Sequence, residues 1–147
     1  MDERDGAGEA ATIDDRTGME VLGLEECLAL LGSTPIGRVV FVDGEGQPLA
    51  LPVNYLWYED SVVFRTLEGQ KVRAAVANQK VAFEVDRWDP ETGTGISVLV
   101  KARAEVVDQW AEREQLEQLD LLPWAHEVWR TTWIRLTPVD ISGRRVN

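Results

Sequence analysis

The sequence predicts a mainly β protein, an antiparallel six-stranded β-barrel with short satellite helices. Three observations support this fold class. About six apolar or alternating segments have the length of strands. Tight turn signals separate them, and only short helical segments lie between them. The chain of 147 residues, 44% of them hydrophobic, is long enough for one domain with a substantial core.

The N-terminal segment differs from the rest of the chain. Residues 1–20 hold seven acidic side chains against two arginines and lack apolar periodicity, which predicts a disordered acidic tail. We therefore expect the barrel domain to occupy residues 21–147. Its first element is a helix at Leu24–Leu31, where apolar residues recur at helical spacing and Gly32 follows as a stop signal.

Two strands joined by a tight turn are expected next. The segment Ile36–Val42 is rich in β-branched residues, and the Asp-Gly-Glu-Gly sequence at 43–46 is a hairpin signal. The following strand, Pro48–Tyr58, carries two prolines. Because proline cannot donate a ladder hydrogen bond, this strand is expected to lie at a sheet edge, or to be bulged or bent near Pro52.

The second half of the chain continues the pattern. The expected elements, in order, are a strand at Val81–Val85, a Pro- and Gly-rich loop at 86–95, an alternating strand at Ile96–Val107, a helix at 108–122 with Asp108 as its N-cap, a last strand at Thr132–Leu136 and a closing segment at 141–145.

The stretch from Ser61 to Asp86 gathers the residues that suit an anion. An apolar strand brings Arg65 and Thr66 to its end, and a short helix is expected to open at 68–69 with Lys71 in its first turn. Free N–H groups and the helix dipole favour an anion at such a junction. Arg65 would add a planar fork and Lys71 a point charge. The residues alone also fit an ordinary strand–helix connection with solvated charges.

Charge and composition exclude several classes of function. The net charge is −11, which argues against a general nucleic-acid or anionic-membrane surface. No run of 18 apolar residues and no secretory signal appears, so a cytoplasmic protein is expected. With one cysteine and one histidine, the chain offers no metal-ligand cluster and no Cys–His pair. Any chemistry is therefore expected to come from a bound cofactor.

The pattern FRTxxGxK resembles the pyridoxamine 5'-phosphate oxidase-like family, the FMN-binding split barrels. It follows PVNY, precedes VAFEVD, and is accompanied by the late ISGRRV, so the similarity runs from about Gly23 to the C-terminus. The resemblance implies a split barrel that holds FMN at a homodimer interface. It implies that the phosphate is bound by Arg65, Thr66 and Lys71. It also implies that the flavin ring lies against Pro52, Val53 and Asn54.

The implied activity is flavin-dependent oxidation or reduction of a small molecule. The substrate-phosphate residues of the oxidase proper have no match in this chain, so oxidation of vitamin B6 is not expected. Two alternatives remain. One is an F420-dependent reductase of the same fold, which the acidic balance disfavours; the other is a non-catalytic flavin- or haem-binding module. The homodimer is also expected from the aromatic surface of Trp110, Trp124, Trp129 and Trp133, with Trp124–Trp133 covering the partner's flavin.

Overall fold

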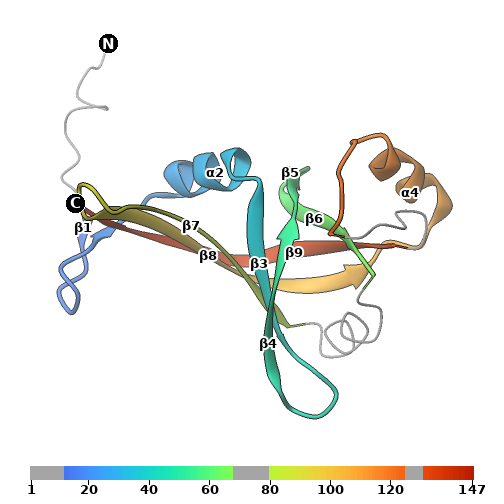
Figure 1. Ribbon diagram of the computed structural model, residues 1–147, viewed down its shortest axis with the longest axis horizontal. Coiled ribbons are helices and arrows are strands. Elements are labelled where there is room, and N and C mark those ends of the chain that lie inside the picture. Colours follow the sequence, from blue (N-terminus) through green and yellow to red (C-terminus); the bar gives the residue numbers. More distant parts are fainter. Residues whose placement is uncertain (1–11, 68–79, 125–130) are drawn as a thin grey trace.

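The computed structural model describes residues 12–67, 80–124 and 131–147, and these form mostly strands (Figure 1). The elements in order are β1 (Thr12–Ile13), β2 (Glu20–Val21), α2 (Leu24–Ser33), β3 (Ile36–Val42), β4 (Pro48–Asn54), β5 (Leu56–Tyr58), β6 (Ser61–Thr66), β7 (Val81–Asp89), β8 (Thr94–Val106), α4 (Trp110–Glu117) and β9 (Thr132–Val146). Within the described residues, six strands have six or more residues, as predicted; β1, β2 and β5 are shorter.

All strands join one antiparallel sheet that does not close into a complete barrel. The order along the sheet is β1-β2-β9-β8-β7-β3-β4, and β6 pairs with β9 on one side and with β5 on the other. The first part of β9 therefore pairs with β6 along one edge and with β8 along the other. Among the described strands, β4 pairs with β3 alone, so β4 is an edge. The sheet is open between β4 and β6, and this opening is the split of the barrel.

Alternating side chains build the core. Along β8, Val98, Val100, Ala102 and Ala104 are buried, while the residues between them face outward, which confirms the predicted half-buried strand. Phe83 and its neighbours from β7 face the same interior. The helix α2 covers one end of this core through three buried residues, Cys27, Leu30 and Leu31.

The Pro-bearing strand is an edge strand, as predicted, but its break lies at Tyr55 rather than at Pro52. Pro52 keeps its register opposite Arg38, because an edge strand does not need its N–H for a second neighbour. Tyr55 is 2% exposed, and its hydroxyl donates a 2.6 Å hydrogen bond to the carbonyl of Leu31. The buried tyrosine therefore ends β4 and redirects the chain into β5.

The predicted loop at 86–95 is wrong for most of its length. β7 continues to Asp89 and β8 begins at Thr94, which leaves a turn at 90–93. Trp88 pairs with Gly95 across the ladder. A Cβ on Gly95 would lie 2.5 Å from the indole ring of Trp88, so glycine at this position lets the ring lie over the neighbouring strand. The composition of this stretch suggested a loop, whereas its cross-strand packing favours a long hairpin.

The last strand is continuous where two segments were expected. Pro138 pairs with Ala102, and the next pair is Asp140 with Lys101, so the register shifts and Val139 is bulged. The bulge accommodates the proline without ending β9.

The helices also differ from their predicted bounds. The helix α2 runs through Gly32 to Ser33, and α4 covers Trp110–Glu117 with Gln109 as its N-cap, so it is shorter than the predicted 108–122. Asp108 therefore lies before the cap of this helix. Among the described residues, no helix has the length and apolar character needed to cross a bilayer.

Part of the predicted tail is ordered in the structure. β1 and β2 form a small hairpin, and β2 pairs with the end of β9. The Asp14 carboxylate lies 3.5 Å from the Arg144 guanidinium, and Arg145 contacts both Glu20 and Glu26. Ordered structure therefore begins no later than Thr12, and residues 1–11 lie outside the described part of the chain.

Candidate functional site at the opening between β4 and β6

The opening of the barrel contains a small hollow, called here the β4–β6 hollow. Its wall combines three residues of β4, the end of β6 and one tryptophan, namely Leu51, Pro52, Val53, Arg65, Thr66, Leu67 and Trp124. The structure therefore brings Pro52 and Val53 next to Arg65 and Thr66, four of the six residues that the sequence suggested for a cofactor. The hollow has a volume of about 140 Å³.

Asn54, the fifth predicted residue, does not line the hollow but holds its tryptophan. The Trp124 Nε1–H donates a 2.9 Å hydrogen bond to Asn54 Oδ1. The Asn54 amide in turn donates to the carbonyl of Leu122, also at 2.9 Å. Because both groups of the amide are used, Asn54 fixes the segment after α4 against the edge strand.

Lys71, the sixth predicted residue, lies outside the described residues, as does the predicted helix start at 68–69. The same holds for His126 and Trp129.

Arg65 is buried, with 7% of its surface exposed, and among the described residues its guanidinium contacts the side chains of Thr131, Glu117 and Trp133. Nε donates to Thr131 Oγ1 at 2.7 Å. Nη1 and Nη2 lie 3.0 and 3.2 Å from the two carboxylate oxygens of Glu117. The ring of Trp133 lies beneath the guanidinium, 4.7 Å from Cζ to the ring centroid. This is a bidentate ion pair with a cation–π contact on one face.

Glu117 also accepts a hydrogen bond from a second side chain, the indole of Trp133. Its Oε2 also accepts a 2.9 Å hydrogen bond from Trp133 Nε1. Trp133 is fully buried in its own chain and packs with Val63 and Leu116. It therefore adds nothing to an exposed aromatic surface, in contrast to Trp110 and Trp124, which are 76% and 60% exposed.

Glu117 and Thr131, two of the residues around Arg65, were missed by sequence reasoning, and Trp133 was expected on an aromatic surface rather than against Arg65. Glu117 is the last residue of α4, and Thr131 precedes β9, so nothing in local spacing relates them to Arg65. One signal was present. A carboxylate in the last turn of a helix is unfavourable to the helix dipole, which suggests an external cation as its partner.

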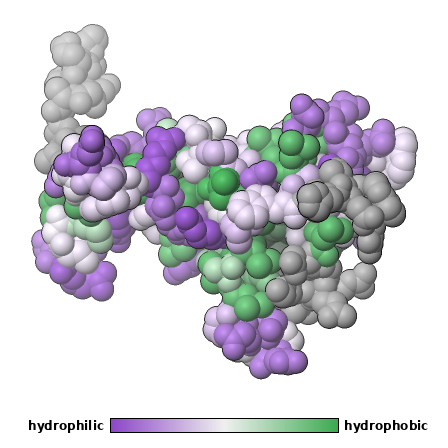
Figure 2. Space-filling view, in the orientation of Figure 1, coloured by the Kyte–Doolittle hydropathy of each residue, from purple (hydrophilic) through white to green (hydrophobic). Residues whose placement is uncertain are grey.

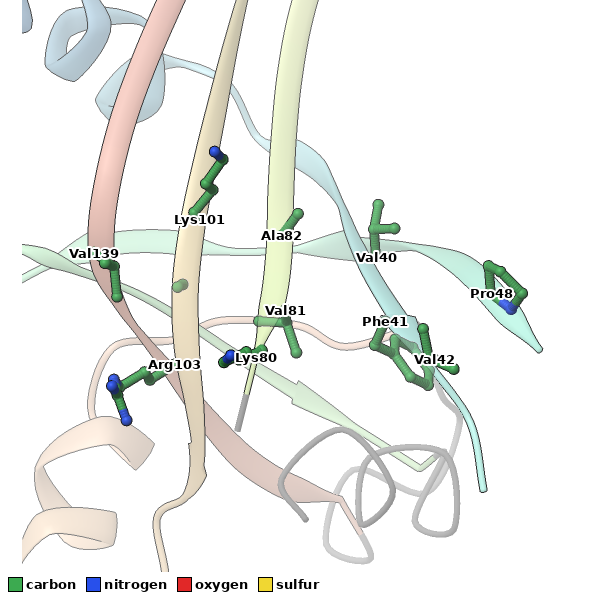
Figure 3. Close-up of a pocket in the computed structure, with 11 residues that line it drawn as sticks. Val40, Phe41, Val42, Pro48, Lys80, Val81, Ala82, Lys101, Arg103 and Val139 are labelled. Atoms are coloured by element: carbon green, nitrogen blue, oxygen red, sulfur yellow. The ribbon is translucent and has the colours of Figure 1, made fainter. Parts of the chain in front are cut away.

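A larger depression, called here the basic groove, lies on the outer face of the sheet (Figure 3). It has a volume of about 430 Å³, and it is lined by Val40, Phe41, Val42, Pro48, Lys80, Val81, Ala82, Lys101, Ala102, Arg103 and Val139. Figure 3 shows Arg103 of β8 near Lys80, and Lys101 farther along the same strand. None of these three cations makes a hydrogen bond or ion pair with another described residue. In a chain of net charge −11, such a cluster favours an anionic occupant.

An acidic cluster lies on the same face as the basic groove. Glu84 and Asp86 follow Ala82 along the outward side of β7, and both contact Arg38 of β3, at 2.9 and 3.3 Å. Burial of the Glu84 carboxyl, together with the adjacent Asp86 carboxylate, raises its pKa to about 7. The outer face therefore carries positive charge toward one end of β7 and negative charge toward the other. Figure 2 shows apolar surface over the β3–β4 hairpin down to its polar tip.

The β4–β6 hollow fits one part of a flavin rather than a whole one. Its apolar wall from β4 and Trp124 suits an aromatic ring, and Thr66 and Arg65 have the donors that suit an anionic group. Sites for ligands of drug size usually have about 300–1,000 Å³, so a flavin in this hollow would need further walls. The guanidinium that would bind its phosphate is also already paired with Glu117.

The fold and the hollow define an antiparallel split barrel with a proline-bearing edge strand facing a buried arginine. The family model of pyridoxamine 5'-phosphate oxidase matches residues 24–145, and the chain belongs to this family.

Sequence relatives and solved structures agree with this assignment. An uncharacterized protein of Mycobacterium tuberculosis is 34% identical over 130 residues, covering 85% of this chain and 84% of that protein. The FAD binding protein from Mycobacterium smegmatis is 37% identical with a TM-score of 0.71, covering 86% of this chain and 99% of that one. A Corynebacterium glutamicum protein, crystallised as a candidate pyridoxamine 5'-phosphate oxidase, is 30% identical with a TM-score of 0.76, covering 88% and 98%.

Proposed function

We propose that the protein is an FMN-dependent oxidoreductase that acts on a small molecule and holds its flavin at a homodimer interface. The observation that carries this proposal is the β4–β6 hollow, which combines the apolar wall of Pro52 and Val53 with Arg65 and Thr66. Family membership and the 37% identical FAD binding protein support a flavin as the ligand. When bound, the flavin supplies the redox chemistry, and the protein binds and orients it.

Different residues of this chain would bind the ring and the phosphate of the flavin. The β4 wall and Trp124 would pack against the ring and exclude water, and Asn54 would keep Trp124 in place through its 2.9 Å hydrogen bond. Arg65, Thr66 and Lys71 would contact the phosphate. Because the hollow is smaller than a flavin site, a second subunit would complete the pocket.

The absorbance and fluorescence spectra of the purified protein test the cofactor. After reconstitution with FMN, FAD or F420 in parallel, we expect FMN to give a stoichiometric flavin spectrum and the tightest binding. Tighter binding of F420 would replace the proposal with an F420-dependent reductase. A haem spectrum, or no binding of any of these cofactors, would overturn it.

The outer face of the sheet supports the homodimer. Two copies facing each other across a two-fold axis would place the basic groove of one subunit against Glu84 and Asp86 of the other, and the apolar lining between them would be buried. The exposed Val40 and Val42 lie within this patch, at 36% and 43%. Charge complementarity of this kind sets the register of an interface.

Sedimentation of charge-reversal variants tests the dimer. We expect Lys101→Glu to shift the protein toward monomer and to weaken FMN binding together with dimerisation. Arg113→Glu, an exposed change of the same charge on α4, is the control and should leave both unchanged. Adding Glu84→Lys to Lys101→Glu should restore the dimer. A monomer that binds FMN with full affinity would refute the shared site.

A further inference from the structure

The carboxylate of Glu117 contacts Arg65, one of the residues that line the β4–β6 hollow, in the manner of a bound anion. It accepts from both terminal nitrogens of Arg65, at 3.0 and 3.2 Å, and from the indole of Trp133, at 2.9 Å. A guanidinium fork presents the same pair of donors to a phosphate. An anionic ligand that contacts Arg65 through Nη1 and Nη2 therefore competes with Glu117 for the same two donors.

The two partners of this ion pair differ in how firmly they are held. The Arg65 side chain is 6% exposed, whereas the Glu117 side chain is 39% exposed. Thr131 and the ring of Trp133 also contact Arg65, and Trp133 is fully buried. Leu116, which is 1% exposed, anchors α4 one residue earlier. Glu117 can therefore rotate toward solvent without displacing the arginine or the helix core.

The position of Glu117 in α4 is unfavourable by itself. It is the final residue of the helix, where the dipole disfavours negative charge, and the last turn contains no basic residue. Glu114, on the same helix, is exposed and makes no contact with Arg65. The arginine contact thus accounts for the location of Glu117.

We propose that Glu117 is a specificity-determining residue of the hollow, an internal competitor that an anionic cofactor must displace from Arg65. The inference rests on the proposed function, in which Arg65 contacts the cofactor phosphate. It adds that binding of the phosphate releases Glu117 and thereby the end of α4. A ligand without an anionic group would leave the Arg65–Glu117 pair intact.

The test compares Glu117→Gln with the matched control Glu114→Gln. Glutamine keeps the size and a hydrogen-bonding oxygen but removes the competing charge. We expect Glu117→Gln to bind FMN about tenfold or more tightly than the parent, because one charged competitor is removed. Glu114→Gln should bind like the parent. The melting temperature of Glu117→Gln should be lower than that of the parent without phosphate and should rise more steeply when inorganic phosphate is added.

The outcomes separate this inference from the proposed function. If FMN binds the parent, and Glu117→Gln binds it equally or more weakly, Glu117 is a structural partner of Arg65 and the inference is wrong while the function stands. If neither protein binds a flavin, but phosphate stabilises Glu117→Gln selectively, the flavin assignment fails and the competition stands.

Should Glu117→Gln not fold, Glu117→Asp keeps the charge on a shorter side chain that weakens the bidentate contact. Tighter FMN binding supports the competition, and unchanged or weaker binding overturns it.

Discussion

Glu84 and Asp86 lie side by side on the outward face of β7 and share one arginine, Arg38. The pKa of the Glu84 carboxyl is raised from 4.5 to about 7, first because the group is partly buried and then because Asp86 is adjacent. In the unfolded chain neither cause persists. The folded protein therefore holds a proton on Glu84 more tightly than the unfolded chain does.

Because the pKa of Glu84 differs between the folded and the unfolded chain, the free energy of unfolding depends on pH. A group whose pKa is raised by folding stabilises the fold below its unfolded pKa, and this contribution is lost as pH rises through the folded value. We therefore expect the free energy of unfolding of the parent, relative to Glu84→Gln, to fall by about 1–3 kcal/mol between pH 4.5 and about 7. Urea unfolding across this range measures it.

Two further variants test whether the interaction of Glu84 with Asp86 causes this pH dependence. Asp86→Asn should reduce the pH dependence, because it removes the neighbouring charge. Glu91→Gln, in the turn at 90–93, should leave it unchanged, since this side chain is exposed and makes no contact with the pair. A parent and a Glu84→Gln variant with parallel pH curves would show that Glu84 does not titrate in this range.

The candidate site was predictable only where it follows from strand order. Pro52 and Val53 lie on an edge strand, and Arg65 and Thr66 end a buried strand, as the sequence predicted, and the fold brings these two strands together. The partner of Arg65 was not predictable. Glu117 lies 52 residues away on a helix, and its contact depends on how α4 packs through Leu116. Arg65 was expected as an available anion ligand, whereas the structure places it in a buried ion pair.

The close packing of β3 against β7 depends on one glycine. Gly37 in β3 has no side chain, and a Cβ there would lie 2.1 Å from Cζ of Phe83, which is fully buried. Backbone and ring can therefore approach only because the position is glycine.

We expect Gly37→Ala to destabilise the protein by about 1–3 kcal/mol, because the Phe83 ring or the β3 backbone must shift to avoid the new methyl group. Chemical denaturation measures the change. Gly44→Ala is the matched control, since a Cβ at Gly44 meets no atom within 4 Å and this variant should unfold like the parent. Equal stability of the two variants would mean that the Phe83 ring or the β3 backbone shifts at little cost in free energy.

The strands show why periodicity predicts some elements well and others poorly. The alternation in β8 reflects one buried and one outward face, a local property, and its prediction was confirmed. The end of β7 was expected to be a loop, because Pro90 and the glycines nearby are turn residues. Its pairing with β8 is stabilised by the stacking of Trp88 over Gly95, a contact between strands that composition does not reveal.

The N-terminal hairpin of β1 and β2 extends the sheet beyond β9, so ordered structure reaches further toward the N-terminus than the composition suggested. A chain that begins at Met19 loses β1 and the contact of Asp14 with Arg144. Compared with a chain that begins at Thr12, we expect a melting temperature lower by about 2–4 °C. Thermal unfolding of the two truncated chains decides it. Identical melting curves would show that the hairpin does not contribute to stability.

The position of β9 in the sheet has a consequence for synthesis. β6 and β8 both pair with β9, and Thr131, just before β9, is 66 residues after its partner Arg65. At a translation rate of about 5–20 residues per second, that interval lasts roughly 3–13 s. During this time the nascent β6 has an unpaired edge and an arginine without its final neighbours, a condition that favours aggregation. The yield of soluble protein should therefore depend on how fast the ribosome reads the codons between β6 and β9.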